Sequence, residues 1–314
     1  MSSRSIEHDL ELAIGRPVLA IAPIDTGHSG FTYWVTTDLP EAMVLRLAPP
    51  GVRIAGPADV ARQGRIMRAL TLAGLPVPRV IDTTGHPTID GRPFILLEKV
   101  DGERIEAVKG RVADEALAGS AVAVLRRLHR VPLAETGIAD EAPVSLETEL
   151  HRWNRLIEHA PPELRVLAPK VAERLRNTVP GQGTPALIHG DYHYGNLLFK
   201  GSEVAGVVDW EIAALGQPLV DLASLALIAD AGKRGLRVPG GSRVDASLEF
   251  VVETYGAKTT DLRWFLGLAY FKLAAIFGYN LMLHRRGKRH DPHNESRARE
   301  VGTYLEAARE VLGA

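Results

Sequence analysis

The chain has 314 residues, of which 46% are hydrophobic and 24% charged, and its formal net charge is −1. This is the composition of a globular protein with ample core material, and the charge balance excludes a strong general attraction to nucleic acid or to an anionic membrane. The absence of cysteine excludes disulfides, thiolate zinc sites and cysteine nucleophiles, and it fits a cytoplasmic location, which we predict.

Neither a signal peptide nor a membrane span is expected. The first ten residues are polar and mixed in charge, without the apolar core that a signal peptide needs. The longest apolar stretch, Leu262–Leu283, is interrupted by Arg263 and Lys272 and is rich in aromatic and small residues. It therefore predicts a buried helix of a large domain and no membrane partner.

The first hundred residues have mainly strand patterns. One helix is expected over Ala58–Ala73, because apolar residues recur there at helical spacing and Gly74 and Pro76 follow. Alternating or continuous apolar runs between turn residues predict a sheet of five strands. The expected strands are Val18–Ala22, Phe31–Thr37, Met43–Leu47, Arg79–Ile81 and Phe94–Glu98.

Helical patterns dominate the rest of the chain, beginning with Val112–Arg130. The shift from strands to helices predicts two lobes, residues 1–100 and residues 101–314, and an α+β fold. One island of the second lobe has a different pattern, with short strands expected at Ala186–His189, Leu197–Phe199 and Val204–Val208. From Pro218 onward helices are expected again, with a break around Arg237–Gly241.

The island carries the polar residues that point to chemistry. Asp191 and Asn196 share a glycine-containing loop, and Asp209 follows the last of the three short strands. A hairpin would bring Asp209 beside Asn196, so that carboxylate and amide oxygens of the kind that Mg²⁺ prefers converge. Such a set suits the transfer of a phosphoryl group from a metal-bound triphosphate, with a separate carboxylate orienting the attacking hydroxyl.

An ordinary turn or a zinc site would also account for parts of the island. A His-Gly-Asp sequence is by itself common in turns. His189 and His193 are four residues apart, the spacing of a helical zinc pair, but Gly190 and Gly195 disfavour a helix and no glutamate follows the first histidine.

The motif as a whole resembles a known family. His189-Gly190-Asp191 followed by Asn196 resembles the HGDxxxxN catalytic loop of the aminoglycoside phosphotransferase and choline kinase group, relatives of protein kinases. Asp209-Trp210-Glu211 is similar to the metal-binding motif of that group, and Leu215–Ala223 to the segment that follows it. The pattern is most similar to a bacterial branch whose eukaryotic relatives are fused to acyl-CoA dehydrogenases. The resemblance implies a protein-kinase-like bilobal fold, with a β-rich N-terminal lobe that binds the nucleotide and a mainly helical C-terminal lobe with the catalytic loop and acceptor site.

The resemblance also implies roles for residues of the island. Asp191 would be the catalytic base, and Asn196 and Asp209 would hold Mg²⁺, with Glu211 as an outer contact. His189 would brace the loop, and Asp221 would anchor the helix that follows.

On the nucleotide side, Gly27, Ser29 and Gly30 lie where the family places its phosphate-covering loop, which glycines let approach phosphate oxygens. Arg46 occupies the third-strand position that holds phosphates, and backbone groups near Glu98 and Val100 would meet the adenine edge. The helix position that usually supplies a glutamate is Gln63, which cannot form an ion pair with Arg46. The co-substrate is expected to be ATP or GTP, with no preference indicated.

The acceptor is the least determined partner. Residues 261–300 carry eight Lys or Arg against four Asp or Glu, including the run Arg285–His290, and an aromatic face precedes that run. A solvated helix end would explain the run, but an acceptor with negative charge and an apolar part, such as a hydroxylated acyl-CoA-like compound, would use it. Aminoglycosides are polycations, so we do not expect an aminoglycoside acceptor. The aromatic residues concerned are Trp264, Phe265, Tyr270, Phe271 and Phe277.

These observations predict a phosphotransferase that moves the nucleotide γ-phosphoryl group onto a hydroxyl of a small molecule. The alternative is a nucleotide-binding pseudokinase without transfer, which the missing helix glutamate favours and the intact Asp191, Asn196 and Asp209 disfavour. A protein kinase is disfavoured by the His-Gly-Asp loop and by the short stretch between Asp209 and Asp221.

Overall fold

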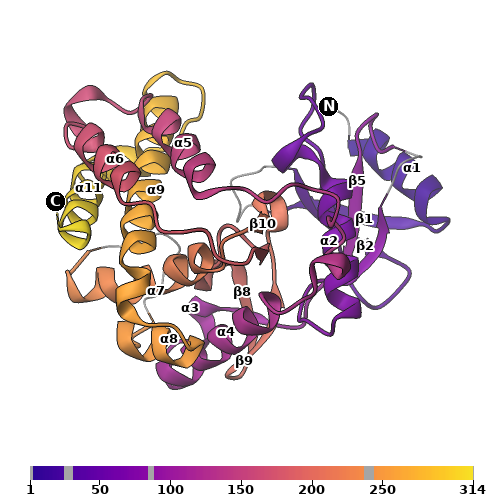
Figure 1. Cartoon of the computed structure of the whole chain (residues 1–314). Helices are drawn as coiled ribbons and strands as arrows, with labels where there is room; N and C mark the ends of the chain where they lie inside the picture. Colours follow the sequence, from indigo (N-terminus) through magenta and orange to yellow (C-terminus); the bar gives the residue numbers. More distant parts are fainter. Residues whose placement is uncertain (1–2, 25–30, 84–87, 237–243, 314) are drawn as a thin grey trace.

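The computed structural model describes residues 3–24, 31–83, 88–236 and 244–313. A smaller part with a five-stranded sheet adjoins a larger, mainly helical part (Figure 1). The last strand of the first sheet ends at Glu98, and the first strand of the next sheet begins at Glu103. The change of architecture thus occurs between Glu98 and Glu103, close to the predicted boundary at residue 100. The division into residues 1–100 and 101–314 stays a prediction.

The first sheet is antiparallel, with the strand order β1-β2-β3-β5-β4. In β3, Met43, Leu45 and Leu47 are buried while Val44 and Arg46 alternate with them, as a pleated strand requires. Arg46 therefore lies on the face of the sheet opposite to Leu45. The strands are β1 (Val18–Pro23), β2 (Thr32–Thr37), β3 (Met43–Leu47), β4 (Val80–Thr83) and β5 (Phe94–Glu98).

One face of this sheet is covered by a helix that the sequence analysis missed. Helix α1 (Ser3–Ile14) buries Ile6 and Leu10 against Leu45, Leu47 and their neighbours in a core of its own. The prediction of a single helix in the first lobe was therefore wrong. The pattern was present, because Ile6, Leu10, Ala13 and Ile14 have the i, i+4, i+7, i+8 spacing of an amphipathic helix.

The expected helix is α2 (Val60–Leu72), which follows a short 3₁₀ turn, η1 (Gly56–Ala58). Asp59 caps α2 by accepting a hydrogen bond from the backbone N–H of Arg62 at 2.9 Å. The side chain of Arg62 forms two 2.6 Å bonds to the carboxylate of Glu141, which belongs to the larger part of the molecule. The helix is thus tied by a bidentate ion pair to a segment that lies far away in the sequence.

The larger part is built around one long helix, α9, which packs against α5, α7 and α11. Helix α9 is long and apolar enough to cross a membrane, but 67% of its most apolar window is buried in the fold, which confirms the expected buried helix. The α-helices are α3 (Ile105–Val108), α4 (Asp114–Leu128), α5 (Leu146–Ile157), α6 (Ala168–Asn177), α7 (Leu219–Lys233), α8 (Leu248–Tyr255), α9 (Thr259–Arg285), α10 (His293–Ser296) and α11 (Ala298–Leu312). Short 3₁₀ turns are η2 (Leu133–Glu135), η3 (Pro162–Leu164), η4 (Tyr194–Asn196) and η5 (Trp210–Ile212). The expected break around Arg237–Gly241 falls on residues outside the described part.

The island forms two small antiparallel sheets. Strand β7 (Ala186–Ile188) pairs with β10 (Ala214–Gly216), and β6 (Glu103–Arg104), β8 (Leu197–Lys200) and β9 (Glu203–Val207) form a second sheet in the order β6-β8-β9. Strands β8 and β9 make the predicted hairpin, with Leu197 opposite Val207. The end of the loop that leads into β8 therefore lies beside the start of the loop that follows β9.

Candidate active site

A buried carboxylate holds the loop that follows β7. Asp221, at the start of α7, is fully buried and accepts hydrogen bonds from the backbone N–H groups of His189 (2.6 Å) and Gly190 (2.8 Å). Gly190 has a φ of +83°, and a Cβ there would lie 2.8 Å from the carbonyl oxygen of Ile212. Only glycine fits this turn, so the sequence His-Gly-Asp follows from the local geometry.

His189 joins this loop to the end of β9. Its Nε2 lies 2.8 Å from the carbonyl oxygen of Val208, and its Nδ1 accepts from the N–H of Asp191 at 3.2 Å. The ring packs on Trp210, with 4.7 Å between ring centroids. Both ring nitrogens are therefore used inside the protein, which argues against the zinc interpretation.

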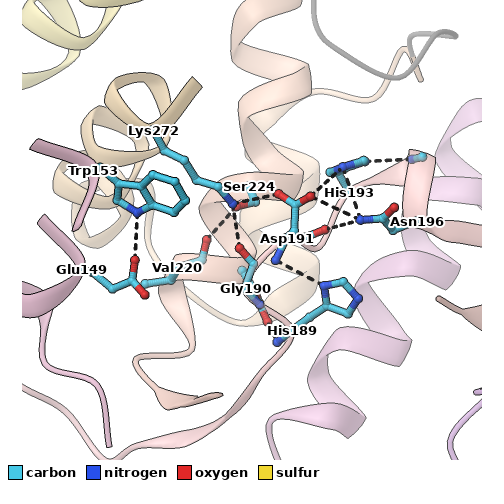
Figure 2. A network of polar contacts seen from close by, with 12 residues as sticks. Glu149, Trp153, His189, Gly190, Asp191, His193, Asn196, Val220, Ser224 and Lys272 are labelled. Carbon is cyan, nitrogen blue, oxygen red and sulfur yellow. Dashed lines mark hydrogen bonds and ion pairs between the residues drawn. The ribbon is translucent and has the colours of Figure 1, made fainter. Parts of the chain in front are cut away.

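Asp191 presents its carboxylate at the surface of the loop, with 37% of its side chain exposed. Oδ1 accepts from Nζ of Lys272 at 2.8 Å, and Oδ2 lies 3.3 Å from Nε2 of His193 (Figure 2). Burial would raise the pKa of Asp191, but Lys272 and His193 outweigh it and hold that pKa well below its usual value. The group is therefore a carboxylate anion at neutral pH.

Asn196 lies beside Asp191, and the chain directly after β9 lies beside Asn196. The amide Nδ2 of Asn196 donates to the backbone oxygen of Asp191 at 3.0 Å, whereas its Oδ1 accepts no hydrogen bond from any residue that the structure describes. The backbone oxygen of Asn196 accepts from the N–H of Val208 at 2.9 Å, directly before Asp209. Asp209 has a left-handed backbone with φ 67°, which is uncommon for a residue other than glycine and often marks a functional site.

Arg46 brings the first sheet to this place. Its Nη1 lies 2.8 Å from Oδ1 of Asp209, and its Nη2 contacts the carboxylate of Glu211. Gln63 does not take part, because its amide Nε2 donates to the backbone oxygen of Pro57 at 3.0 Å. In place of the ion pair that a glutamate at position 63 would make, Arg46 pairs with carboxylates of the second lobe. Helix α2 is held separately, through the ion pair of Arg62 with Glu141.

Two neighbouring carboxylates, those of Asp209 and Asp191, act electrostatically on Glu211. Burial first, and then the negative charge of Asp209, raise the pKa of Glu211, with Asp191 adding to the effect and Arg46 opposing it. Excess negative charge at one point is the condition that a divalent cation relieves. This excess charge is accompanied by two possible oxygen ligands for a cation. One is Oδ1 of Asn196, which accepts no hydrogen bond from the described residues, and the other is the partly exposed carboxylate of Asp209.

These residues fit a cation that is shared with phosphate, and they do not form a closed protein cage. Within the described ranges, no group of three or more His, Asp or Glu residues is arranged to hold a metal by itself. Mg²⁺ in nucleotide sites is commonly bound by one or two protein groups together with phosphate oxygens and waters. The donor set of Asn196 and Asp209 is of that kind.

The segment that links the two sheets packs on the β8–β9 hairpin. Gly206 of β9 leaves room for Val100, since a Cβ at residue 206 would come within 2.9 Å of the valine side chain. The N–H of Val100 donates to no group in the described part of the chain, whereas the N–H of Glu98 donates to the backbone oxygen of Arg79 at 2.9 Å. The side chain of Glu98 pairs with Arg79, so of these two N–H groups only that of Val100 is open to a ligand.

A cleft of about 430 Å³ opens where Arg46 and Glu211 meet. Its walls come mostly from β3 and the segment that leads to α2, and one residue, Arg289, comes from the segment after α9. Gly27, Ser29 and Gly30, the predicted phosphate loop, lie outside the described residues. The lining residues are Phe31, Arg46, Leu47, Pro49, Val52, Ala55, Pro57, Ala58, Val60, Glu211 and Arg289.

The basic run after α9 divides into residues with different contacts. Arg285 pairs with Glu295 and Glu163 and so belongs to the surface structure of the helix end. The chain then reverses at Gly287, which has a φ of +66°, and Arg289 turns to the cleft, where its Nη1 donates to Oδ1 of Asn280 at 3.2 Å. Both arginines are exposed to solvent, but Arg285 is ion-paired at the helix end, whereas Arg289 also lines the cleft.

The aromatic face expected beside the acceptor is not a surface. The five aromatic residues concerned are all buried in the main core, none more than 9% exposed. Their spacing on α9 reflects packing against neighbouring helices, so this part of the prediction was wrong. The residues are Trp264, Phe265, Tyr270, Phe271 and Phe277.

Lys272 is the residue of the site that the sequence analysis missed. It was noted there only as an interruption of an apolar stretch, yet it lies against Asp191. A single lysine on an otherwise buried helix requires an anionic partner in the fold. That requirement was the signal that could have placed it, although it does not name the partner.

Comparison with known proteins agrees with this geometry. A model of the phosphotransferase enzyme family matches residues 20–249. Acyl-CoA dehydrogenase family member 10 of Mus musculus is 30% identical over 217 residues, which cover 65% of this chain and 20% of that protein. Family member 11 of Gallus gallus is 28% identical over 285 residues, or 82% of this chain and 36% of that protein. The chain thus spans only a fifth to about a third of the length of these relatives.

Solved structures with the same fold are phosphotransferases. A provisionally named aminoglycoside phosphotransferase of Ralstonia eutropha JMP134 superimposes with a TM-score of 0.76 at 20% identity, covering 96% of this chain and 98% of that one. Spectinomycin phosphotransferase in complex with ADP and spectinomycin gives a TM-score of 0.66 at 14% identity, covering 100% and 98%. These likenesses confirm the protein-kinase-like α+β fold with a sheet-containing N-terminal lobe and a helical C-terminal lobe. Together with the family match over residues 20–249, they show that the chain belongs to the phosphotransferase enzyme family.

Proposed function

We propose that this chain transfers the γ-phosphoryl group of ATP or GTP, bound with Mg²⁺, to a hydroxyl group of a small molecule. The observation that carries the proposal is that Asp191 contacts Asn196 and that the chain beside Asn196 leads into Asp209, which pairs with Arg46 of the first sheet. Phosphoryl transfer depends mainly on positioning and on stabilising negative charge, and this arrangement supplies groups for both.

Asp191 is the proposed base. The acceptor oxygen forms a bond to the γ-phosphorus, the bond from that phosphorus to the β–γ bridging oxygen breaks, and the nucleoside diphosphate leaves. The hydroxyl proton passes to the carboxylate of Asp191, which is an anion at neutral pH. Because the proton can leave late in a loose transition state, a weak and well-placed base is sufficient.

Asn196 and Asp209 are the proposed holders of Mg²⁺, through Oδ1 of the amide and the carboxylate. When bound, the cation neutralises charge on the phosphate oxygens. Arg46 would exchange its carboxylate partners for phosphate oxygens of the nucleotide, for which a guanidinium is well suited. The N–H of Val100 is the proposed contact for the base edge, and Gly27, Ser29 and Gly30 remain the proposed phosphate-covering loop.

The pseudokinase alternative loses its main argument. That argument was Gln63, which cannot pair with Arg46, but Asp209 and Glu211 provide the pairing instead. We therefore retain transfer as the function.

For the acceptor, we propose a small molecule that carries negative charge, and not an aminoglycoside. Arg289 lines the cleft beside Arg46, and because Arg46 is assigned above to the nucleotide, Arg289 is the cation of this wall that remains for the acceptor. An anionic group of the acceptor would be attracted there, whereas a polycation would be repelled. Hydroxylated acyl-CoA-like compounds are one class with such a charge.

The test is thermal stabilisation by nucleotide followed by an acceptor screen. MgATP or MgGTP should raise the Tm, and Asp209→Asn should abolish the part of the increase that depends on Mg²⁺. A screen of hydroxylated carboxylic acids, their CoA thioesters and kanamycin should then reveal turnover with an anionic acceptor. Absence of any metal-dependent stabilisation would contradict the proposed nucleotide site, and rapid turnover with kanamycin as the sole acceptor would overturn the proposed acceptor class.

A further inference from the structure

Lys272 lies in the interior of α9, with 9% of its side chain exposed, and its ammonium group reaches the catalytic loop (Figure 2). Nζ donates to the backbone oxygen of Gly190 at 2.7 Å and to Oδ1 of Asp191 at 2.8 Å. A buried ammonium is costly unless it is paired and hydrogen-bonded, and both conditions are met here. The contact therefore belongs to the built structure of the loop.

The remaining side of the ammonium group is also occupied. Nζ lies 5.3 Å from the centroid of the Trp153 ring, a cation–π distance, and Nε1 of Trp153 donates to Glu149 at 2.8 Å, which fixes the ring. The niche beside Lys272 has a volume of about 10 Å³, room for about one water molecule. Within the described part of the chain, two oxygens and an aromatic face surround the ammonium group, and the niche beside it has no room for a ligand larger than a water molecule.

We propose that Lys272 is a positioning residue, which holds the carboxylate of Asp191 in the orientation that phosphoryl transfer requires. The inference rests on the proposed function of Asp191 and adds a residue to it. Lys272 holds Oδ1 from α9, and His193 and Asn196 hold Oδ2 from within the loop, at 3.3 and 3.4 Å. A carboxylate gripped on both oxygens cannot rotate freely about its side-chain bonds.

The same contacts indicate which oxygen receives the proton. A carboxylate offers about four lone-pair sites. Nδ1 of His193 accepts from the N–H of Gly195 at 3.0 Å, so the ring proton is on Nε2 and points to Oδ2. Oδ2 thus accepts from both His193 and Asn196, whereas Oδ1 accepts from Lys272 alone among the residues that the structure describes. Oδ1 retains a lone pair for the hydroxyl of the acceptor, next to the ammonium that orients it.

The test compares Lys272→Met, which keeps the length of the stem and removes the charge, with the wild type. The activity is the transfer of the labelled γ-phosphoryl group of ATP or GTP with Mg²⁺, measured as free phosphate when water is the acceptor and as labelled product with an acceptor found in the screen. We expect kcat to fall by roughly 10- to 100-fold, part of the usual effect of general-base loss, with the KM for nucleotide changed less than threefold. Lys233→Met, which removes a similar contact to Glu249 on the surface, should leave both constants unchanged.

A second comparison tests whether Lys272 acts through Asp191. Adding Lys272→Met to Asp191→Asn should lower kcat no further, because the orientation of the base no longer matters. Full additivity of the two losses, or equal losses in kcat and in nucleotide affinity, would mean that Lys272 is merely structural. If Lys272→Met gives no cooperative thermal transition, Lys272→Gln, which can still donate to the oxygen of Gly190, replaces it in both comparisons.

A crystal structure of the same variant gives a readout that does not need turnover. The carboxylate of Asp191 should leave its position or occupy two rotamers. An unmoved, well-ordered carboxylate would overturn the inference about Lys272 whether or not the wild type is active. Absence of transfer of the labelled γ-phosphoryl group by the wild type, to water and to every acceptor, would instead count against the proposed function, so the two failures are distinguishable.

Discussion

Asp221 is fully buried, and its two oxygens accept from two successive backbone N–H groups of the loop that follows β7. The family resemblance implied that Asp221 anchors the following helix. The partners of its carboxylate, His189 and Gly190, lie about thirty residues earlier in the chain and were not predicted. The same limit applied to Lys272. A lysine in a buried helix indicates that an anionic partner is needed, but the identity of that partner depends on how α9 packs in the folded chain.

At this scale we predict how Asp191 contributes to stability. Because the folded protein holds the pKa of Asp191 well below its unfolded value, the carboxylate stabilises the fold above the unfolded pKa, and this stabilisation is lost as the pH falls through the folded pKa. Asp191→Asn should lower the Tm at pH 7 by roughly 2 °C. The difference should persist down to about pH 4 and narrow below that.

Calorimetry between pH 7 and pH 3 measures this difference. Asp38→Asn is the matched control, since Asp38 forms an ion pair with Arg16 on the surface. A Tm for Asp191→Asn equal to that of the wild type at pH 7 would contradict the prediction.

Among the secondary-structure elements, periodicity located the five strands, α2, α4 and the β8–β9 hairpin, whereas it failed for α1. The helical spacing of Ile6, Leu10, Ala13 and Ile14 was present in that segment, but we tested the first ten residues only for the apolar core of a signal peptide. The surface on which the helix packs, which includes Leu45 and Phe94, is formed by distant strands and is not visible in the local pattern.

Helix α2 supplies the second prediction. Arg62→Met should lower the free energy of unfolding by about 1–3 kcal/mol, because the bidentate bond to Glu141 is lost and a partly buried carboxylate stays behind. Urea unfolding measures the loss. The double variant Arg62→Met with Glu141→Met should cost less than the two single losses added together, and strict additivity would show that the pair is not coupled.

At the scale of the whole molecule, the cleft combines residues from both ends of the chain. Phe31 and Arg46 come from the first sheet, and Arg289 comes from the segment after α9. The sequence indicated a basic run but could not say which member faces the cleft. That choice is made by the reversal at Gly287, which separates Arg285 on the surface from Arg289 in the cleft wall.

This arrangement gives a third prediction. Arg289→Gln should raise the KM for an anionic acceptor by roughly tenfold, the loss of about 1.4 kcal/mol of charge attraction, with kcat little changed. Steady-state kinetics with the acceptor identified in the screen measures the effect. Arg286→Gln is the control, since Arg286 does not line the cleft. An equal change in both variants would indicate a general effect of surface charge.

The contact between Val100 and Gly206 has a consequence for how nucleotide preference can evolve. Val100, whose N–H is the proposed contact for the base, lies in the segment between β5 and β6 and packs against Gly206 of the β8–β9 hairpin. Asn196 and Asp209, the proposed ligands of the cation, lie at the two ends of that hairpin. A larger side chain at position 100 would therefore press on the hairpin and move those two residues. On the proposed roles, we expect substrates to diversify in this chain by change at the acceptor side, while the segment proposed to contact the base stays fixed.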